Sequence, residues 1–151
     1  MEVSFEPELC VVIGRICKDV PEERVDDVVF GYTCGNDLTA RDVQKTDLQW
    51  ARAKGFDTSA PLGPWIETEL NTEDLQIQGR LNGELRQDGS TSQMIRGVRE
   101  LVSIVSQAFT LLPGDVIMTG TPAGVGLVQA GDRFEVEIEG IGRLSNPVVR
   151  R

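Results

Sequence analysis

The apolar segments of this 151-residue chain are mostly short and end at turn-forming residues, which favours a fold built from strands. Leu9–Ile13 is apolar throughout, as in a buried strand, and Gly14 ends it. Residues 131–140 alternate between apolar and polar side chains, as antiparallel strands with one exposed face do. The other expected strands are in residues 26–37 and in residues 75–87, which turn as a hairpin at Asn82-Gly83. Residues 115–126 are expected to form a strand that leads into a glycine-rich loop.

One segment, residues 90–111, has the periodicity of an amphipathic helix, because its apolar residues recur at three- and four-residue spacing. A second helix is expected to begin near Thr39 and Asp42, whose spacing is that of a capping box. Residues 50–66 contain two glycines and two prolines, and we interpret them as an ordered loop that returns into a strand at Trp65. The prediction is one α+β, β-rich domain with a single long helix.

Composition excludes several classes of protein. The net charge of −9 disfavours nucleic acids and anionic membranes as partners, because both attract a surplus of lysine and arginine. No membrane span or signal peptide is recognisable, so a cytoplasmic protein is expected. Cys10, Cys17 and Cys34 lack CxxC spacing and are interpreted as buried thiols. Because the chain has no histidine, Ser-His-Asp and Cys-His nucleophile systems and imidazole-bound metals are excluded.

Three carboxylates are candidate metal ligands. Glu6 and Glu8 are two residues apart at the start of an apolar strand, so both side chains leave the same face. Asp37 follows the next expected strand. Oxygen ligands without nitrogen or sulfur suit a hard divalent ion, Mg²⁺ or Mn²⁺. The alternatives are a solvated acidic strand end for the glutamates and a helix cap for the aspartate.

Two further groups accompany these carboxylates in the sequence. Arg41, Gln44 and Lys54 cluster after Asp37, although each could be an ordinary surface residue. Residues 119–126, TGTPAGVG, follow an expected strand and match neither common phosphate-binding motif. Such a glycine-rich segment can present backbone N–H groups to an anion, or it can simply form a tight turn.

Six segments together closely resemble the catalytic domain of the fumarylacetoacetate hydrolase family. They are FEPELCVVIG, GYTCGNDLTARDVQ, AKGFDTSAPLGPWI, LNGE, LLPGDVIMTGTPAGVG and GDRFEVEIEGIGRLSNPV. The resemblance runs from about residue 4 to residue 149, and the motifs follow the family's order. It implies a mixed β-sandwich or roll, usually a homodimer, that carries Mg²⁺ or Mn²⁺.

The resemblance also implies roles for particular residues. The family's metal ligands match Glu6, Glu8 and Asp37. Its substrate-binding positions match Arg41, Gln44, Lys54, Gly55 and Thr121, and Lys54 is the candidate catalytic residue. Family members generally carry an N-terminal lid whose histidine and glutamate activate water. Residues 1–151 are therefore expected to be a catalytic domain without that lid, either a fragment or a short form.

The activity that the resemblance implies is metal-dependent chemistry on small 2-oxo acids, including diacids, in the catabolism of aromatic compounds. A divalent ion would chelate the 1-carboxylate and the 2-oxo oxygen and stabilise an enolate. One enolate serves hydrolysis of an acylpyruvate, decarboxylation of an oxaloacetate-like acid, and isomerisation of a 2-hydroxy-dienedioate, so all three stay open. The alternative is a catalytically silent ligand-binding or interaction domain, or an inactive fragment that lacks the lid.

Overall fold

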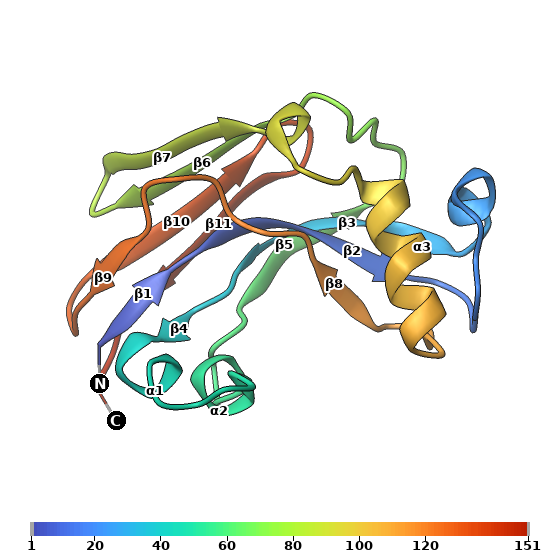
Figure 1. The fold of residues 1–151 in the computed structure, drawn as a ribbon. Coiled ribbons are helices and arrows are strands. Elements are labelled where there is room, and N and C mark those ends of the chain that lie inside the picture. Colours follow the sequence, from blue (N-terminus) through green and yellow to red (C-terminus); the bar gives the residue numbers. More distant parts are fainter. Residues whose placement is uncertain (1, 151) are drawn as a thin grey trace.

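The computed structural model describes residues 2–150, whose strands form two four-stranded sheets and one three-stranded sheet (Figure 1). All neighbouring strands pair antiparallel. The first sheet has the order β5 (Leu62–Glu67), β3 (Val29–Asn36), β2 (Pro7–Ile13), β8 (Val116–Met118). The second has the order β11 (Gly142–Pro147), β10 (Arg133–Ile138), β6 (Gln76–Leu81), β7 (Glu84–Ser90). The small third sheet has the order β4 (Thr39–Ala40), β1 (Val3–Phe5), β9 (Gly126–Val128).

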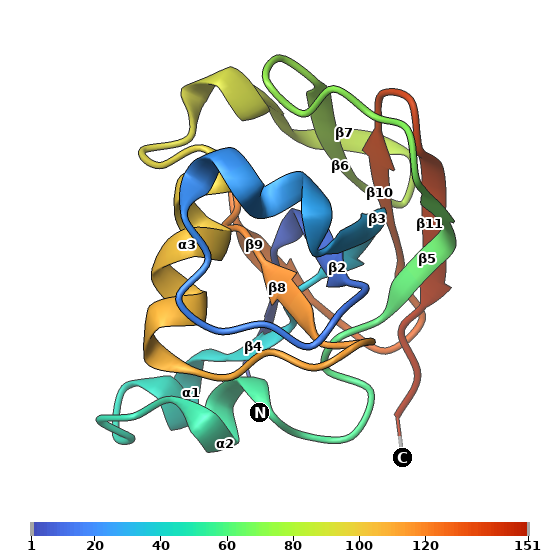
Figure 2. The same ribbon diagram turned by 90° about the vertical axis from the view of Figure 1, so that its right-hand side faces the viewer.

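Helices are short and lie at the margins of the sheets (Figures 1 and 2). The α-helix α3 is Val98–Ala108 and lies beside β8, while α1 and α2 lie together near β4. The remaining helices are α1 (Arg41–Gln44), α2 (Ala51–Lys54) and the 3₁₀ turns η1 (Glu22–Asp27) and η2 (Thr91–Gln93). Within residues 2–150, no helix is long and apolar enough to cross a membrane.

The hydrophobic core lies between the two large sheets. Phe5 of β1 and Phe134 of β10 stack in this core with ring centroids 4.2 Å apart, and both side chains are buried. Aromatic pairs of this kind stabilise a core beyond the area that they bury. Gly79 of β6 lets the sheets approach beneath β2, because a Cβ there would lie 2.9 Å from Pro7. This close contact supports the start of β2, where the candidate metal ligands lie.

The strand-rich architecture was predicted correctly, and so was the hairpin turn at Asn82-Gly83. The predicted helix over residues 90–111 is wrong in extent, because η2 forms first and α3 begins at Val98. The capping box at Thr39 and Asp42 is also wrong, since Ala40 is the N-cap of α1. Residues 50–66 are not only a loop: they contain α2, and β5 begins before Trp65.

Candidate active site

The candidate ligands are brought together by the pairing of β2 with β3. Glu6 is the single residue between β1 and β2, and Glu8 is the second residue of β2. The register places Glu8 opposite Gly35, so Asp37, one residue beyond the end of β3, lies opposite Glu6. Two hydrogen bonds hold this corner: Asp37 N donates to Glu6 O (2.9 Å), and Glu6 N donates to Asn36 Oδ1 (2.8 Å).

The three carboxylates converge in the structure. One oxygen of each lies within 4.8 Å of the corresponding oxygens of the other two. Glu6 is 7% exposed and Glu8 is 3% exposed, which contradicts the alternative of a solvated acidic strand end. Buried like charges at this separation repel strongly, so the arrangement requires compensating cations.

Lys54 supplies one of these cations from the C-terminal end of α2. Its ammonium donates to Glu6 Oε2 (2.9 Å), to Thr39 Oγ1 (3.0 Å) and to the Asp37 carboxylate. Burial lowers the pKa of Lys54, but the hydrogen bonds and charges of Asp37 and Glu6 outweigh it, and the net pKa is raised. The Ser59 hydroxyl donates to Lys54 O (2.5 Å) and holds the backbone behind this side chain. Lys54 is therefore a positioned, permanently charged group.

Arg41 supplies the second cation, at the first position of α1. Its guanidinium donates to the Glu6 carboxylate, to Ser4 Oγ (2.7 Å) and to Gln44 Oε1 (2.8 Å). Gln44 thus reaches the candidate site through Arg41. Gly55 caps α2, where a Cβ would lie 2.6 Å from Ala51 O, so a side chain would disturb the residue that follows Lys54. The structure places Arg41 beside the carboxylates and gives Gly55 a backbone role.

The glycine-rich segment reaches the site through its backbone. Gly120 N donates to Glu8 Oε2 (2.7 Å). The anion that the segment contacts with its backbone is therefore a carboxylate of the same chain. Thr121 follows directly and is half-buried. Thr119 fixes the segment to β2, since its backbone N–H and its hydroxyl both donate to Leu9 O (3.1 and 2.8 Å).

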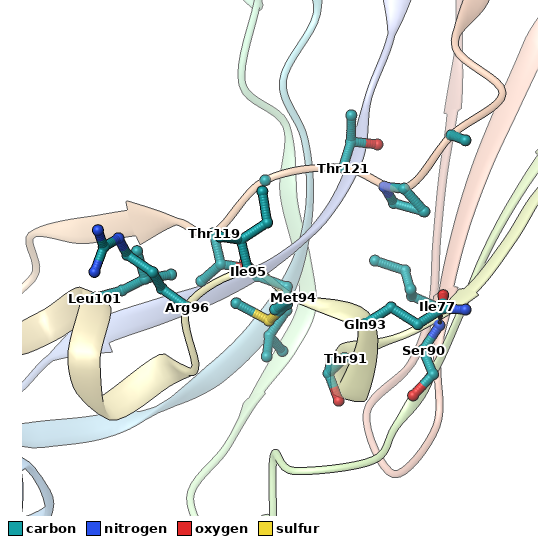
Figure 3. A pocket seen from close by; sticks show the side chains of 14 residues that line it. Ile77, Ser90, Thr91, Gln93, Met94, Ile95, Arg96, Leu101, Thr119 and Thr121 are labelled. Atoms are coloured by element: carbon teal, nitrogen blue, oxygen red, sulfur yellow. Dashed lines mark hydrogen bonds between the residues drawn. The ribbon is translucent and has the colours of Figure 1, made fainter.

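A cavity of about 560 Å³ lies on the other side of this segment (Figure 3). Thr119 and Thr121 lie on one side of it, and Gln93 and Met94 lie on the other. Its lining includes Leu9, whose neighbour Glu8 points to the opposite face of β2, and none of the three carboxylates lines it. None of the three carboxylates opens into the cavity, but the cavity and the candidate metal centre adjoin through Gly120, which lines the cavity and donates to Glu8.

The donor set fits a hard divalent ion. Glu8 Oε1 and Asp37 Oδ1 accept no hydrogen bond from any residue in the range 2–150, whereas the second oxygen of each carboxylate is anchored. Outer contacts of this kind orient ligands in metal centres. The three carboxylates, together with Lys54 and Arg41, carry a net formal charge of −1. A bound divalent ion would change that net charge to +1. Such a centre would attract an anionic substrate.

Protonation of Glu8 gives a prediction for pH dependence. Burial raises the pKa of the Glu8 carboxyl to about 7; the Gly120 N–H lowers it, and the charges of Asp37 and Glu6 raise it further. Below that pH the metal-free site holds a proton that a cation must displace. We expect the apparent Mn²⁺ affinity to weaken about tenfold per pH unit below about pH 7 and to level off above it. Calorimetric titrations across this range measure it; a pH-independent affinity contradicts the prediction.

Sequence reasoning missed four residues that build the site. Ser4 accepts a hydrogen bond from Arg41, Asn36 accepts one from Glu6 N, and Thr39 accepts one from Lys54. Gly120 N donates one to Glu8. Thr39 lies in a motif whose spacing predicts a helix cap, and Gly120 lies in the glycine-rich segment, for which anion binding is one of the two predictions. Nothing in the local sequence distinguishes Ser4 or Asn36 from other polar residues at strand ends.

The comparison with protein families identifies the class. The family model for the fumarylacetoacetate (FAA) hydrolase C-terminal domain matches residues 1–149. The chain therefore belongs to the fumarylacetoacetate hydrolase family, as the six sequence motifs predicted. Members of this family are enzymes that act on small molecules, among them isomerases, hydrolases and tautomerases.

Individual relatives carry several activities. A 2-hydroxyhepta-2,4-diene-1,7-dioate isomerase from Mycobacterium marinum is 53% identical, with a TM-score of 0.98 over 99% of this chain and 60% of its own. Oxaloacetate tautomerase YisK of Bacillus subtilis is 41% identical over 97% of this chain and 52% of its own length. A fumarylpyruvate hydrolase from Pseudomonas aeruginosa, in complex with Mn²⁺ and pyruvate, is 38% identical, with a TM-score of 0.93 over 99% of this chain and 67% of its own. The chain spans 57% to 62% of the length of three curated relatives that are 51% to 54% identical to it.

Proposed function

We propose that this chain is the catalytic domain of a Mg²⁺- or Mn²⁺-dependent enzyme that acts on 2-oxo acids or diacids by way of an enolate. The observation that carries the proposal is the convergence of Glu6, Glu8 and Asp37, with Lys54 and Arg41 in contact with them. The fumarylpyruvate hydrolase that binds Mn²⁺ and pyruvate supports it, since pyruvate is itself a 2-oxo acid. Glu6, Glu8 and Asp37 would hold the ion.

The bound ion would supply a Lewis acid for the substrate's carboxylate and oxo oxygens. The chain's own residues would do the rest. Lys54 would place a fixed positive charge where negative charge grows as an enolate forms, and such preorganised charge is the largest single contribution in many enzymes. Arg41 would fix the orientation of Glu6 and help neutralise the site. Gln44, Gly55 and Thr121 complete the proposed substrate site, with the Thr121 hydroxyl as the donor to the substrate.

Three reactions remain within the proposal: hydrolysis, decarboxylation and isomerisation, in the cytoplasmic catabolism of aromatic compounds. The relatives include both a dienedioate isomerase and a fumarylpyruvate hydrolase, and enolate formation is common to all three reactions. The alternative is a catalytically silent ligand-binding domain, which would keep the carboxylates and bind a 2-oxo acid without turnover.

Steady-state assays test the proposal. The chain is assayed on oxaloacetate and on an acylpyruvate, with Mg²⁺, with Mn²⁺ and with a chelator. We expect turnover of at least one substrate that the chelator abolishes and added ion restores. Binding of pyruvate and Mn²⁺ without any turnover would favour the silent domain, and failure to bind either would overturn the metal-dependent function.

We also propose that the chain forms a homodimer. Large apolar side chains are exposed around α3, with Ile95 fully exposed and Phe109 and Leu112 at least half exposed. Exposed apolar surface, where it is contiguous, marks protein interfaces. The interface is expected to bury more than about 1,000 Å². Light scattering at micromolar concentration should give twice the monomer mass, and the monomer mass itself would contradict the proposal.

A further inference from the structure

The glycine-rich segment touches the second large sheet as well as the strand that carries the glutamates. The side-chain amide of Gln87, in β7, donates from Nε2 to Thr121 Oγ1 (3.0 Å) and to Pro122 O (2.6 Å). A Cβ on Gly89 would lie 2.9 Å from Pro122, and one on Gly124 would lie 2.6 Å from Arg86 O. The segment therefore rests directly on β7, while the cavity of Figure 3 lies on its α3 side.

The orientation of the Gln87 amide follows from its partners. Pro122 O is a carbonyl and can only accept, so the amide nitrogen must face it. That nitrogen carries two hydrogens, and the second is directed at Thr121 Oγ1. Gln87 is 1% exposed, and its Oε1 is buried without a hydrogen-bond partner among residues 2–150. The amide thus leaves one buried acceptor unpaired while its two N–H groups hold Thr121 and Pro122.

The hydrogen bond determines what the Thr121 hydroxyl can do. A hydroxyl has one hydrogen to donate, and an oxygen that already accepts from an amide points that hydrogen elsewhere. Among the hydrogen bonds of residues 2–150, none has the Thr121 hydroxyl as donor. Its chain neighbour Gly120 donates a hydrogen bond from its backbone N–H to Glu8, one of the three carboxylates. Its hydrogen is available to an acceptor that enters the site.

We propose that Gln87 is a positioning residue for substrate: it makes Thr121 a donor to an anionic oxygen, the carboxylate or 2-oxo group of the substrate. The inference rests on the proposed function, because it needs a 2-oxo acid beside the metal centre. Gln87 lies in a different sheet from Glu8 and acts through Thr121 without touching substrate. Specificity for a carboxylate therefore depends on both sheets.

The test measures binding of pyruvate, as the probe, in the presence of saturating Mn²⁺. Gln87→Met keeps the length of the side chain and removes the donor. One hydrogen bond to a charged group corresponds to a loss of about tenfold to a hundredfold in affinity. We expect the pyruvate dissociation constant to rise by about that factor, and KM for the turned-over substrate to rise with it, while Mn²⁺ affinity and kcat stay within about threefold.

A double-mutant cycle separates positioning from simple support of the fold. If Gln87 acts through the Thr121 hydroxyl, Gln87→Met should add no further loss of pyruvate affinity in a Thr121→Val background. Additive losses would mean that Gln87 acts by another route and would overturn the inference. Gln76→Met is the matched control, since that amide lies on the neighbouring strand, is exposed and donates to Asp88 Oδ1 (3.1 Å). It should bind pyruvate as the parent does.

Further outcomes are equally decisive. If the parent binds Mn²⁺ and pyruvate and Gln87→Met binds pyruvate equally well, the inference fails and the proposed function stands. If the parent binds neither, both fail. Should Gln87→Met not fold, Gln87→Glu keeps the shape, and a carboxyl oxygen facing Thr121 would accept the hydrogen of its hydroxyl, so the same loss is expected. Two variants of the parent test the Thr121 hydroxyl by itself. Thr121→Val should weaken pyruvate binding, and Thr121→Ser, which keeps the hydroxyl, should not. Pyruvate binding by Thr121→Val as tight as that of the parent would overturn the inference.

Discussion

Replacing Lys54 with methionine is expected to lower kcat and kcat/KM together by about 10²-fold or more, the scale of removing one preorganised electrostatic group. The ammonium contacts Glu6 and Asp37, so it lies beside the proposed ligands, and negative charge that grows on an enolate there would meet it directly. A charge that only held a remote carboxylate would change KM and leave kcat unaltered. Steady-state kinetics at saturating Mn²⁺ measure both parameters.

Saturating metal is essential to this experiment, because the contacts of Lys54 couple it to the ligands. Removing a cation from between two carboxylates strengthens the attraction of those carboxylates for another cation. Mn²⁺ affinity should therefore be maintained or increased in Lys54→Met. Lys45→Met is the matched control, since Lys45 is exposed and forms a 3.5 Å ion pair with Glu2. Turnover by Lys54→Met equal to that of the control would contradict the catalytic role of Lys54.

The candidate site shows what a sequence can and cannot predict. Period-two spacing was sufficient to place Glu6 and Glu8 on one face, and the structure confirms that their carboxylates converge. Asp37 could not be joined to them by spacing, because its position depends on the β2–β3 register, which is a tertiary property. Lys54 likewise depends on how α2 docks. For both residues, the resemblance to the family predicts a position near the two glutamates, whereas the local sequence pattern does not.

The errors in secondary structure have a similar physical origin. Residues 90–93 do contain a capping box, with Ser90 and Gln93 as its two members, so a helix signal is present. It yields a single 3₁₀ turn, which is fixed to the segment before β6 because Asp74 accepts hydrogen bonds from the hydroxyls of Ser90 and Ser92 (2.5 and 3.0 Å). The backbone at Met94 is extended, and α3 begins at Val98 after its N-cap Gly97. Periodicity alone merges two elements that the extended backbone at Met94 separates.

The second large effect is expected from Glu8→Gln, which should abolish most of the stabilisation of the chain by Mn²⁺. An ion at a hundredfold excess over its dissociation constant stabilises the folded state by about 2.7 kcal/mol. Amides are weaker ligands than carboxylates for hard cations, and a hundredfold weaker dissociation constant would reduce that stabilisation to about 0.4 kcal/mol at the same concentration. Thermal unfolding with and without Mn²⁺ at about pH 8 measures the difference.

The metal-free state of Glu8→Gln distinguishes loss of a ligand from general damage to the fold. Burial raises the pKa of Glu8 to about 7, above the pKa of this carboxyl in the unfolded chain. The free energy of unfolding of the metal-free parent therefore falls as the pH rises from the unfolded-state pKa to about 7, and it stays at the lower value at higher pH. The neutral amide avoids this effect and can still accept the hydrogen bond from Gly120 N. At about pH 8 we therefore expect metal-free Glu8→Gln to be at least as stable as the metal-free parent. Once Mn²⁺ is added, Glu8→Gln should be clearly less stable than the parent.

Asp19→Asn, at an exposed carboxylate 3.5 Å from the Lys18 ammonium, is the control and should keep the full response to Mn²⁺. A parent-like response to Mn²⁺ in Glu8→Gln would remove Glu8 from the proposed metal centre.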